Sequence, residues 1–363
     1  MRQFANCRIV RLGGGVNCVG KGVRGLGKRE GGLGAEGVGA EGVLEEVVGF
    51  GHGGVLMKAL VTGGAGFIGS HLVEGLLAGS WEVVVLDNLA TGFGENVPAG
   101  AKLVTGDAGN RDLLDQVLPG CDAIFHLAAV SSVQDSLDRP IAVHDVNLTA
   151  TLVLLEAAVQ HGVKRFVFSS SAAVYGDTAG EPAREDMKPN PLSHYAVQKL
   201  ASEYYCGVYH RLHCLETVCL RYFNIFGPRQ RGDSPYSGVI AKFLEAGRQG
   251  KPALIFGDGG QTRDFCPVAN VVAANIAAAT RIGEGVAGGI FNVGSGHSIS
   301  VLELAESIVR QYPATGKMEH RQGRNAEIRH SRANISKAGD ILGYQPGASF
   351  ETALEKLISS ARQ

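Results

Sequence analysis

Three glycines at the end of a short apolar run constrain the fold of this chain more than any other feature of its sequence. Residues 58–62 read KALVT and are followed by GGAGFIGSH, which places Gly63, Gly66 and Gly69 at three-residue spacing. One glycine permits a tight turn, one lets the backbone approach a pyrophosphate, and one lets the next helix pack closely on the strand. The motif therefore predicts a strand, a turn and a helix whose N-terminus faces a dinucleotide.

From Met57 onward, short apolar runs alternate with amphipathic stretches. The runs are rich in Val, Ile, Leu and Phe, which is typical of strands buried on both faces; they begin at residues 58, 82, 102, 123, 165 and 217. Helices are expected between them, at residues 70–79, 141–162 and 193–213. This alternation predicts an α/β protein with a Rossmann-type, doubly wound parallel sheet.

The pattern loosens after Gly227 and Pro228. We predict an NAD-binding domain over residues 57–228 plus about 264–292, and a smaller C-terminal α+β substrate lobe over residues 229–263 and 293–363. The glycine-rich residues 1–56 are interpreted as a mis-assigned start or a disordered extension. A transit peptide is a third reading, which their glutamates disfavour.

Charge and composition argue against several classes of partner. The formal net charge is −1, so neither nucleic acid nor an anionic membrane is expected as a partner. No run of about 18 or more consecutive apolar residues is present, so no membrane-spanning helix is expected. The seven cysteines form no CxxC pair and are interpreted as reduced thiols of a cytoplasmic protein. No metal site is predicted.

Acidic residues end the second and third apolar runs. Asp87 lies 24 residues after Gly63, where a carboxylate binds the adenosine ribose hydroxyls and repels a 2′-phosphate, which favours NAD over NADP. A plain strand-turn-helix with a solvated Asp87 is the alternative. Asp107 is either an adenine contact or an ordinary turn residue. After the fourth apolar run come Leu127, Ala128 and Ala129. These small residues either allow the backbone to approach the cofactor or simply pack.

A candidate catalytic set follows from the fifth run and the helix after it. The run ends in serines at 169–171, at the carboxyl edge of the sheet, where such folds bind ligands. Tyr195 and Lys199 are four residues apart and share one helix face. A lysine and a cationic nicotinamide would lower the pKa of Tyr195, so that it acts as a general base on a hydroxyl that Ser171 holds. Taken alone, the Tyr-Lys pair could equally be an ordinary surface pair.

These motifs resemble the extended short-chain dehydrogenase/reductase family, specifically its UDP-glucose 4-epimerase branch. The resemblance covers Met57 to the C-terminus. It is carried by GGAGFIGSH at 63–71, DN at 87–88, HLAA at 126–129, SSSAAVYG at 169–176, YAVQK at 195–199, RYFNIFGPRQ at 221–230, GDGGQTRDF at 257–265, FNVG at 291–294 and NISKA at 334–338.

The resemblance implies a set of site residues by matching motifs. The catalytic residues would be Ser171, Tyr195 and Lys199. The NAD site would add to the glycines and Asp87 the residues Phe67, Ile68, Asn88, Asp107, Ala108, Leu127, Ala128, Ala129, Asn147, Ser169 and Tyr222. The nucleotide sugar would be held by Ser171, Asn224, Val239, Phe256, Arg263 and Arg324, whose arginines suit diphosphate oxygens. For the second arginine, the stretch RQGR at 321–324 offers two candidates.

Two local features bear on the reaction and the sugar. Ala172 and Ala173 follow the catalytic serine, where family members that dehydrate or decarboxylate sugars carry an acid, which argues against those reactions. Ser131 stands where many family epimerases have lysine. Ser331 stands where members restricted to plain hexoses often have a bulky aromatic. We therefore expect N-acetylhexosamine nucleotides to be accepted, although a serine without effect on specificity is the alternative.

The resemblance implies NAD-dependent epimerisation at C4 of a UDP-hexose, through a transient 4-keto sugar and with no net redox change. It also implies a homodimer formed through helices near 145–160 and 194–211. Another nucleotide-sugar enzyme of the family stays open, namely a hexuronate 4-epimerase, a keto-sugar reductase or a synthase. A non-catalytic NAD-binding protein is the remaining alternative, which the retained Ser171, Tyr195 and Lys199 disfavour.

Overall fold

The computed structural model describes residues 11–12, 15–16, 56–231, 238–311, 317–323 and 328–361. The chain forms two compact units, Met1–Gly54 and Val55–Gln363. In the first unit, β1 (Arg11–Leu12) and β2 (Gly15–Val16) pair antiparallel. The expectation for residues 1–56 otherwise falls outside the described residues. The second unit carries the predicted fold and every predicted site residue.

Seven parallel strands form the main sheet, in the order β13-β8-β7-β6-β3-β4-β5. Their bounds are β3 (Lys58–Thr62), β4 (Glu82–Asp87), β5 (Lys102–Thr105), β6 (Ala123–His126), β7 (Arg165–Ser171), β8 (Glu216–Tyr222) and β13 (Gly289–Val293). The chain starts in the middle of the sheet at β3, runs outward through β4 and β5, and then returns to β6 on the other side. The fold prediction is confirmed, and the turn after β3 lies where the strand order reverses, the usual ligand site of such sheets.

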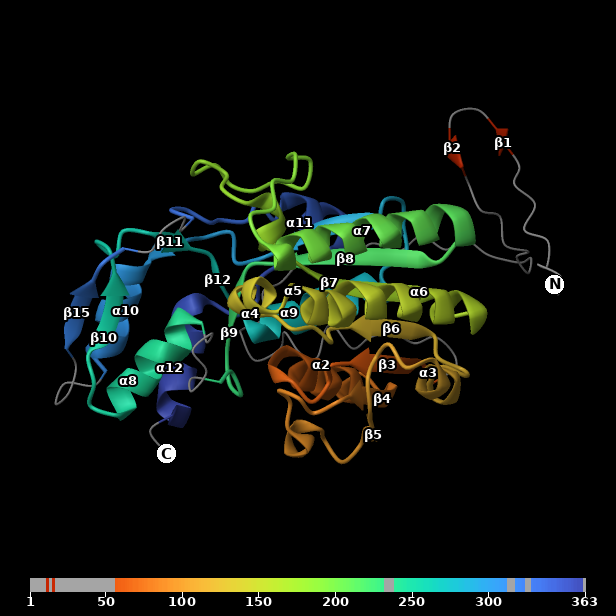
Figure 1. The fold of residues 1–363 in the computed structure, drawn as a ribbon, viewed down its shortest axis with the longest axis horizontal. Coiled ribbons are helices and arrows are strands. Elements are labelled where there is room, and N and C mark those ends of the chain that lie inside the picture. Colours follow the sequence, from red (N-terminus) through yellow and green to blue (C-terminus); the bar gives the residue numbers. More distant parts are fainter. Residues whose placement is uncertain are drawn as a thin grey trace, which may run out of the picture. The chain divides into compact units, whose positions relative to one another are not determined.

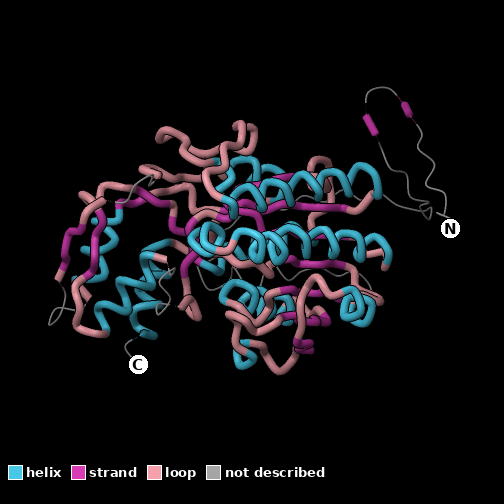
Figure 2. The backbone as a smooth tube through the Cα atoms, viewed as in Figure 1, coloured by secondary structure: helices cyan, strands magenta, loops and turns pink. Residues whose placement is uncertain are grey.

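Helices cover both faces of this sheet (Figures 1 and 2). One face is covered by α2 (Phe67–Ala78), α9 (Val268–Thr280) and α11 (Ser336–Leu342), whose apolar side chains join one core. The other face is covered by α3 (Arg111–Val117), α6 (Ala150–Gln160) and α7 (His194–His213), which contribute to a second core. In Figure 1, α6 and α7 run side by side across this second face.

The second helical prediction, over residues 141–162, corresponds to three consecutive segments. These are α5 (Pro140–His144), a π-helical turn η2 (Asp145–Thr149) and α6. A π turn inserts an extra residue into the helix and is frequent at functional sites. The preceding short helix α4 (Val133–Asp138) and the helices α3, α9 and α11 were not anticipated.

The first helix begins earlier than expected. It starts at Phe67, with Gly66 as its N-cap, rather than at Ser70. Ser70 lies inside the helix, and its hydroxyl donates to the carbonyl oxygen of Phe67. The predicted start of this helix at residue 70 is therefore too late, because the glycine turn itself leads the chain into the helix.

The C-terminal part builds a smaller layer around a third core. It contains α8 (Val239–Arg248), α10 (Val301–Val309) and α12 (Phe350–Ala361), with the parallel pair β10 (Ala253–Phe256) and β15 (Met318–Arg321). Two further pairs connect it to the main sheet region: β9 (Asn224–Phe226) with β12 (Phe265–Pro267), and β11 (Thr262–Arg263) with β14 (Ile299–Ser300). Figure 1 shows α8, α10, α12, β10 and β15 gathered together.

Composition predicts no membrane-spanning helix and seven reduced cysteines. The helical stretch Pro140–Gln160 is long and apolar enough to cross a membrane by length and composition, although such a helix is weak evidence, because a core helix passes the same test. Leu154, Leu155 and Ala158 of this stretch are fully buried in the second core. Among the described cysteines, those at 121, 206, 219 and 266 are free and buried, but Cys214 is disulfide-bonded, so the interpretation of all seven as reduced thiols is wrong there.

Candidate active site

The turn between β3 and α2 has room for glycine alone at two of its three motif positions. Gly63 has a positive φ of 71°, and a Cβ there would lie 2.7 Å from the backbone nitrogen of Ala128. A Cβ at Gly69 would lie 2.1 Å from the carbonyl oxygen of Gly63. The space at Gly66 is less tight, at 3.2 Å from the same oxygen. Gly63 and Gly69 therefore serve the turn itself, while Gly66 exposes its backbone at the helix entrance.

The N-terminus of α2 is built to receive an anion. No side chain caps the helix, so the N–H groups of its first turn, at Phe67 and Ile68, are available to phosphate oxygens. Asp87 lies beside this turn, and its carboxylate accepts the backbone N–H of Ala65 at 3.0 Å and that of Leu89 at 2.8 Å. These residues fit a pyrophosphate and a ribose, because the carboxylate is fixed next to the glycine turn.

The remaining residues expected around the adenosine lie at the ends of β4 and β5. Asn88 is exposed, and its side chain accepts the N–H of Ala90 at 3.0 Å. Asp107 is exposed and accepts the N–H of Gly109 at 2.7 Å, which is the geometry of an ordinary Asx turn. Ala108 is buried in the second core. The structure thus supports the turn role for Asp107, and an adenine contact stays a prediction.

Asn147 holds the segment that follows β6. This buried side chain lies in the π-helical turn, accepts the N–H of Val130 at 2.8 Å and donates to the carbonyl oxygen of Val130 at 3.0 Å. Its second N–H donates to Gln198 at 2.9 Å. Leu127, Ala128 and Ala129 precede Val130 and are half-buried, so Asn147 fixes the backbone along which the cofactor is expected to lie.

A buried histidine links the same segment to β3. His126 lies between Thr62, at 2.8 Å from Nδ1, and Thr151, at 2.9 Å from Nε2. The Thr151 hydroxyl donates to the carbonyl oxygen of Asn147, so it accepts from Nε2–H, and Nδ1 accepts from Thr62. Burial, with a smaller contribution from Lys199, lowers the pKa of His126 to about 3. The ring is therefore neutral, and no motif in the sequence indicated this chain of bonds.

The three serines at the end of β7 have different partners. The Ser169 hydroxyl lies 3.0 Å from the hydroxyl of Tyr222, which also bonds Asn275. Ser170 donates to Glu203 at 2.5 Å. Ser171 accepts the N–H of Ala173 at 3.2 Å. The last of the three lies at the carboxyl edge of the sheet beside α7, as a substrate-holding hydroxyl requires.

Tyr195 and Lys199 lie on the face of α7 that packs on β7. Ser193 caps this helix by accepting the N–H of Ala196, and the N–H of Tyr195 donates to Ser136 of α4 at 3.2 Å. The Lys199 ammonium donates to the carbonyl oxygen of Ser169 at 2.7 Å and lies 5.9 Å from the centre of the Tyr195 ring. The helix therefore brings the phenol, the ammonium and the serine strand end together.

Burial dominates the electrostatics of this set in the protein without cofactor. Burial raises the pKa of Tyr195, and a hydrogen bond with Ser171 offsets part of the rise. Burial lowers the pKa of Lys199 to about 8. Desolvation disfavours both charged forms, and the predicted lowering of the Tyr195 pKa, which also requires the cationic nicotinamide, stays a prediction.

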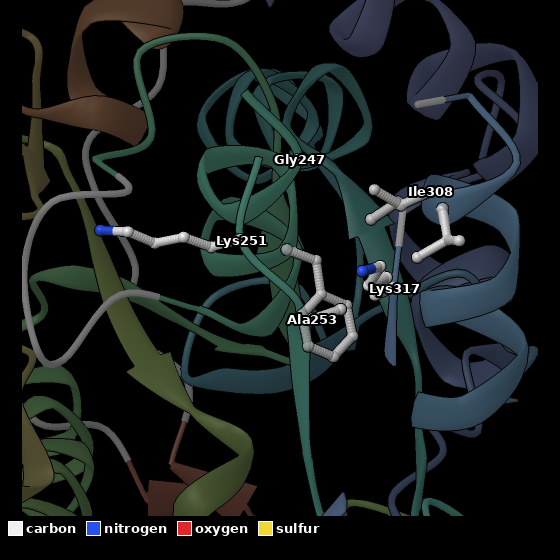
Figure 3. A pocket seen from close by; sticks show the side chains of 7 residues that line it. Gly247, Lys251, Ala253, Ile308 and Lys317 are labelled. Atoms are coloured by element: carbon white, nitrogen blue, oxygen red, sulfur yellow. The ribbon is translucent and has the colours of Figure 1, made fainter. Parts of the chain in front are cut away.

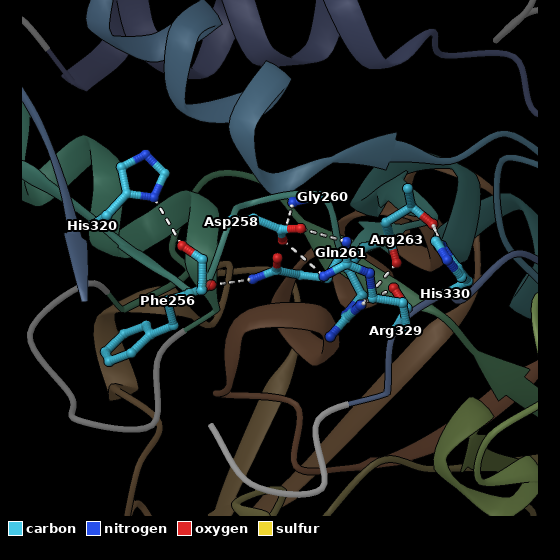
Figure 4. A network of polar contacts seen from close by, with 10 residues as sticks. Phe256, Asp258, Gly260, Gln261, Arg263, His320, Arg329 and His330 are labelled. Atoms are coloured by element: carbon cyan, nitrogen blue, oxygen red, sulfur yellow. Dashed lines mark hydrogen bonds and ion pairs between the residues drawn. The ribbon is translucent and has the colours of Figure 1, made fainter. Parts of the chain in front are cut away.

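The residues expected to hold the nucleotide belong to a polar network of the C-terminal part (Figure 4). Arg263 on β11 donates to the carbonyl oxygens of Thr262, at 2.8 Å, and Arg329, at 3.4 Å. Arg329 forms two hydrogen bonds with Asp258, at 2.8 and 2.7 Å. Phe256 ends β10, and its carbonyl oxygen accepts from Gln261 at 3.0 Å. Asp258, Gln261 and Arg329 were not singled out from the sequence.

The other expected sugar-site residues are spread over several elements. Asn224 begins β9 and is exposed, whereas Val239 begins α8 and is half-buried. Ser331 is half-buried, and its N–H donates to the carbonyl oxygen of Thr262 at 3.1 Å. Arg324 lies outside the described residues. The structure thus brings Ser331 to β11, the strand that carries Arg263.

A small hollow elsewhere in the C-terminal part is too small for any of these ligands (Figure 3). It lies between α8, β10 and α10, is lined by Phe243, Ala253 and Ile308 among others, and holds about 10 Å³. A space of that size admits about one water molecule. It is a packing gap of the third core and not a substrate site.

Comparisons with known proteins agree with the geometry. The chain is 38% identical over 313 residues to the UDP-glucose 4-epimerase of Mycolicibacterium smegmatis, covering 84% of this chain and 99% of the relative. It is 32% identical over 320 residues to a UDP-N-acetyl-alpha-D-glucosaminuronate decarboxylase of Bacillus cytotoxicus, covering 84% and 98%. Overall identity therefore does not separate epimerases from decarboxylases.

A solved structure shares the fold over nearly its whole length. It is the UDP-N-acetylglucosamine 4-epimerase of Methanobrevibacter ruminantium in complex with UDP-N-acetylmuramic acid, with a TM-score of 0.79 and 36% identity, covering 84% of this chain and 97% of that chain. The model of the NAD-dependent epimerase/dehydratase family matches residues 59–294. The cofactor prediction is thereby confirmed, and the chain belongs to the NAD-dependent epimerase/dehydratase family.

Proposed function

We propose that this enzyme interconverts UDP-hexoses that differ in configuration at C4. The observation that carries the proposal is the grouping of Tyr195, Lys199 and Ser171 at the carboxyl end of β7, on the same edge of the sheet as the glycine turn. When bound, NAD supplies a reversible hydride acceptor, so that a secondary alcohol can be oxidised and re-reduced with no net redox change. The protein's own residues bind, orient and deprotonate the sugar.

Each catalytic side chain has a distinct role in this proposal. Tyr195 takes the proton of the 4-hydroxyl as a general base and returns it in the reverse half of the cycle. Ser171, already hydrogen-bonded with Tyr195, holds that hydroxyl in line with the phenol. Lys199 supports the phenolate electrostatically and is itself fixed by the carbonyl oxygen of Ser169.

Because the pKa of Tyr195 is raised in the protein alone, the bound cofactor must supply a charge that lowers it. Burial favours the neutral phenol, so a further positive charge is needed before it becomes an effective base near neutral pH. The oxidised nicotinamide carries such a charge. We therefore expect Tyr195 to be a stronger base toward substrate when the oxidised cofactor is bound than in its absence.

Two alanines distinguish epimerisation from elimination. The residues after Ser171 are Ala172 and Ala173, in a short 3-10 turn, so no carboxylate follows the serine directly to remove a second proton. This supports an epimerase over a dehydratase or decarboxylase, although relatives of both kinds are similar to the chain. A hexuronate 4-epimerase needs no such acid and is the second candidate.

The sugar specificity is proposed from Ser331. This small residue lies on the segment paired with β11, near Arg263. A serine leaves space beside the sugar C2 position, so we propose that N-acetylhexosamine nucleotides are substrates alongside UDP-glucose and UDP-galactose. Arg263 and Arg324 are the proposed diphosphate ligands, with Asn224, Val239 and Phe256 around the nucleotide.

The test uses three sugars with the purified protein beginning at Met57. UDP-glucose, UDP-N-acetylglucosamine and UDP-glucuronate are incubated separately, and products are separated by chromatography. The proposal predicts C4 epimers of the first two sugars. Epimerisation of UDP-glucuronate alone would favour the hexuronate enzyme, and carbon dioxide release from it would contradict the argument from Ala172 and Ala173.

We also propose a homodimer formed through the continuous helical stretch α5, η2 and α6 and through α7, the helices that the resemblance implies. These helices carry apolar side chains that are strongly exposed: Ile141 is 78% exposed, Tyr204 62% and Val197 50%. Such side chains near one another favour a protein partner, and a second copy is the proposed occupant. Light scattering should give twice the monomer mass, and Tyr204→Glu should reduce it; a monomeric wild-type protein would contradict this.

The cytoplasm is the proposed location. Four of the five described cysteines, Cys121, Cys206, Cys219 and Cys266, are free thiols, as expected in a reducing compartment, whereas Cys214 is disulfide-bonded. Fractionation with an antibody should find the protein in the cytosolic fraction. Recovery in a membrane or secreted fraction would contradict the proposal.

A further inference from the structure

A fully buried ion pair lies directly behind the proposed catalytic set. Glu203 on α7 and Arg221 on β8 have side chains that are 1% and 2% exposed. Arg221 donates through Nε to one carboxylate oxygen at 2.9 Å and through Nη2 to the other at 2.7 Å. Ser170 donates to the same carboxylate at 2.5 Å. Three elements, α7, β7 and β8, therefore meet at one carboxylate.

This pair is a costly way to hold a core together. Removing two charges from water costs several kcal/mol per ion, and apolar side chains of similar size often replace a buried pair without loss of stability. One donor of Arg221, Nη1, is also buried without a hydrogen-bond partner among the described residues. Stability alone therefore accounts poorly for Glu203 and Arg221 at this position.

The pair is placed where it can act on the catalytic residues. Glu203 is four residues beyond Lys199 on α7, so both lie on the helix face that packs on β7. Ser170 lies between Ser169, whose carbonyl oxygen accepts from Lys199, and Ser171. Ser170 and Arg221 are also register partners on neighbouring strands. Glu203 thus clamps the residue between the two that contact the ammonium and the phenol.

Arg221 is also held in place on the side away from Glu203. The guanidinium of Arg221 lies 4.6 Å from the centre of the Tyr175 ring. The Tyr175 hydroxyl donates to Asn292 of β13 at 2.6 Å. Asn292 in turn donates to the carbonyl oxygen of Ala183 at 2.8 Å. Movement of Arg221 would therefore require several packed groups to move with it.

The charges around Lys199 come from three elements. On its own helix are Glu203, Cys206 and the Tyr195 phenol; on β6 is His126, which is neutral. Arg221 on β8 reaches Lys199 only through the carboxylate that it binds. Cys206 and, to a smaller extent, Glu203 favour the charged form of Lys199, and Glu203 is the one carboxylate among these groups.

We infer that Glu203 and Arg221 are positioning residues of the proposed reaction, which lock the end of β7 against α7 and set the charge balance around the Lys199 ammonium. The inference rests on the proposed function, because it concerns the same catalytic set. Neither side chain contacts substrate. Both act through Lys199, Ser169 and Ser171.

The effect of the pair on the charge of Lys199 is tested with two single variants of the full chain, Glu203→Gln and Arg221→Met. The first leaves an unpaired cation and should lower the pKa of Lys199 by about 1 unit, whereas the second leaves an unpaired anion and should raise it by about 1 unit. The readout is the ¹³C shift of the Lys199 Cε in lysine-labelled protein, assigned with Lys199→Met. This titration needs no substrate turnover.

The effect of the pair on the position of the β7 end is tested with variants that keep the charges of Glu203 and Arg221. Ser170→Ala removes one hydrogen bond to the carboxylate and is mild enough to fold. Glu203→Asp keeps the charge but shortens the reach. Both should lower kcat about tenfold or more with KM nearly unchanged, while the Lys199 titration stays close to that of the wild type.

The outcomes separate this inference from the proposed function. Opposite shifts of Lys199 in Glu203→Gln and Arg221→Met support it even if no UDP-sugar is epimerised. If the Lys199 pKa shifts in the same direction in both variants, or does not shift, while both variants are less stable, the pair has a structural role only. That result would overturn the inference. If either single variant fails to fold, Ser170→Ala decides: unchanged kcat on a sugar that the wild type epimerises overturns the inference.

Discussion

The main sheet region and the C-terminal part hold their polar side chains in opposite ways. Around Lys199, polar groups are buried and bonded to one another; the side chains of Glu203 and Arg221 are 1% and 2% exposed. Around Arg263, the comparable pair is open to solvent; Asp258 and Arg329 are 64% and 52% exposed. Water competes with the second pair and not with the first. The first region therefore holds its polar groups in a fixed arrangement, as the proposed chemistry requires, whereas the second is freer to rearrange.

The largest effect should come from the base itself. Tyr195→Phe removes one hydroxyl from the buried set and should lower kcat by about 10²–10⁴-fold, because general-base catalysis contributes that much. Tyr209→Phe, on the same helix, is the matched control and should keep wild-type activity. Steady-state rates on UDP-glucose measure both. Full activity in Tyr195→Phe would show that the buried region does not supply the general base.

The two ion pairs should differ strongly in their contribution to stability. Glu203→Gln leaves a buried charge without its partner and should lower the free energy of unfolding by about 3–5 kcal/mol. Asp258→Asn breaks a solvent-exposed pair and should leave that free energy nearly unchanged. Urea denaturation measures both, and equal losses would remove the contrast between the two regions.

The glycine turn should separate folding from cofactor binding. Gly69→Ala places a methyl 2.1 Å from the carbonyl oxygen of Gly63 and should cost about 1–3 kcal/mol of stability, with weaker NAD binding. Gly66→Ala meets that oxygen at 3.2 Å and should cost less stability while still weakening NAD binding. Calorimetric titration with NAD and thermal unfolding would check both; equal stability losses would contradict the space argument.

A smaller effect should appear in acid. His126 has a pKa of about 3 in the folded protein, against 6.5 as its ordinary value. Between these values the unfolded chain binds a proton that the folded chain does not, so the free energy of unfolding falls as the pH falls from 6.5. His126→Asn should flatten this fall between pH 6.5 and about 4, and exposed His320→Asn should not. Urea denaturation at several pH values measures this. The same fall of the free energy of unfolding with pH in all three proteins would contradict the burial of His126.

Features that depend on local pattern were predictable from the sequence. Buried strands appear as continuous apolar runs, and glycines at fixed spacing define the turn, so the sheet, the cofactor turn and the Tyr195–Lys199 spacing could be predicted. Partners far apart in the chain could not. Thr62, His126 and Thr151 meet through tertiary packing, and each is an ordinary residue in its local sequence. Only the place of Glu203, four residues after Lys199, could have been noticed.

The C-terminal part was less predictable for a physical reason. Its strands are two to four residues long, too short to show a hydrophobic period. Arg329 and Asp258 are 71 residues apart and pair at the surface, which no local pattern encodes. The rise that burial causes in the pKa of Tyr195 could not be predicted from the Tyr195–Lys199 spacing either, because desolvation depends on tertiary packing.

The most direct test of cofactor-dependent epimerisation mixes the protein as purified with excess UDP-glucose, adds no cofactor, and monitors the absorbance of reduced nicotinamide and the sugar product together. We predict that the C4 epimer accumulates over many turnovers while only a small, steady fraction of bound cofactor is reduced, and that Tyr195→Phe shows almost no reduction or product. Stoichiometric accumulation of reduced cofactor without epimer, or an unchanged epimer yield from Tyr195→Phe, would contradict the proposed reaction.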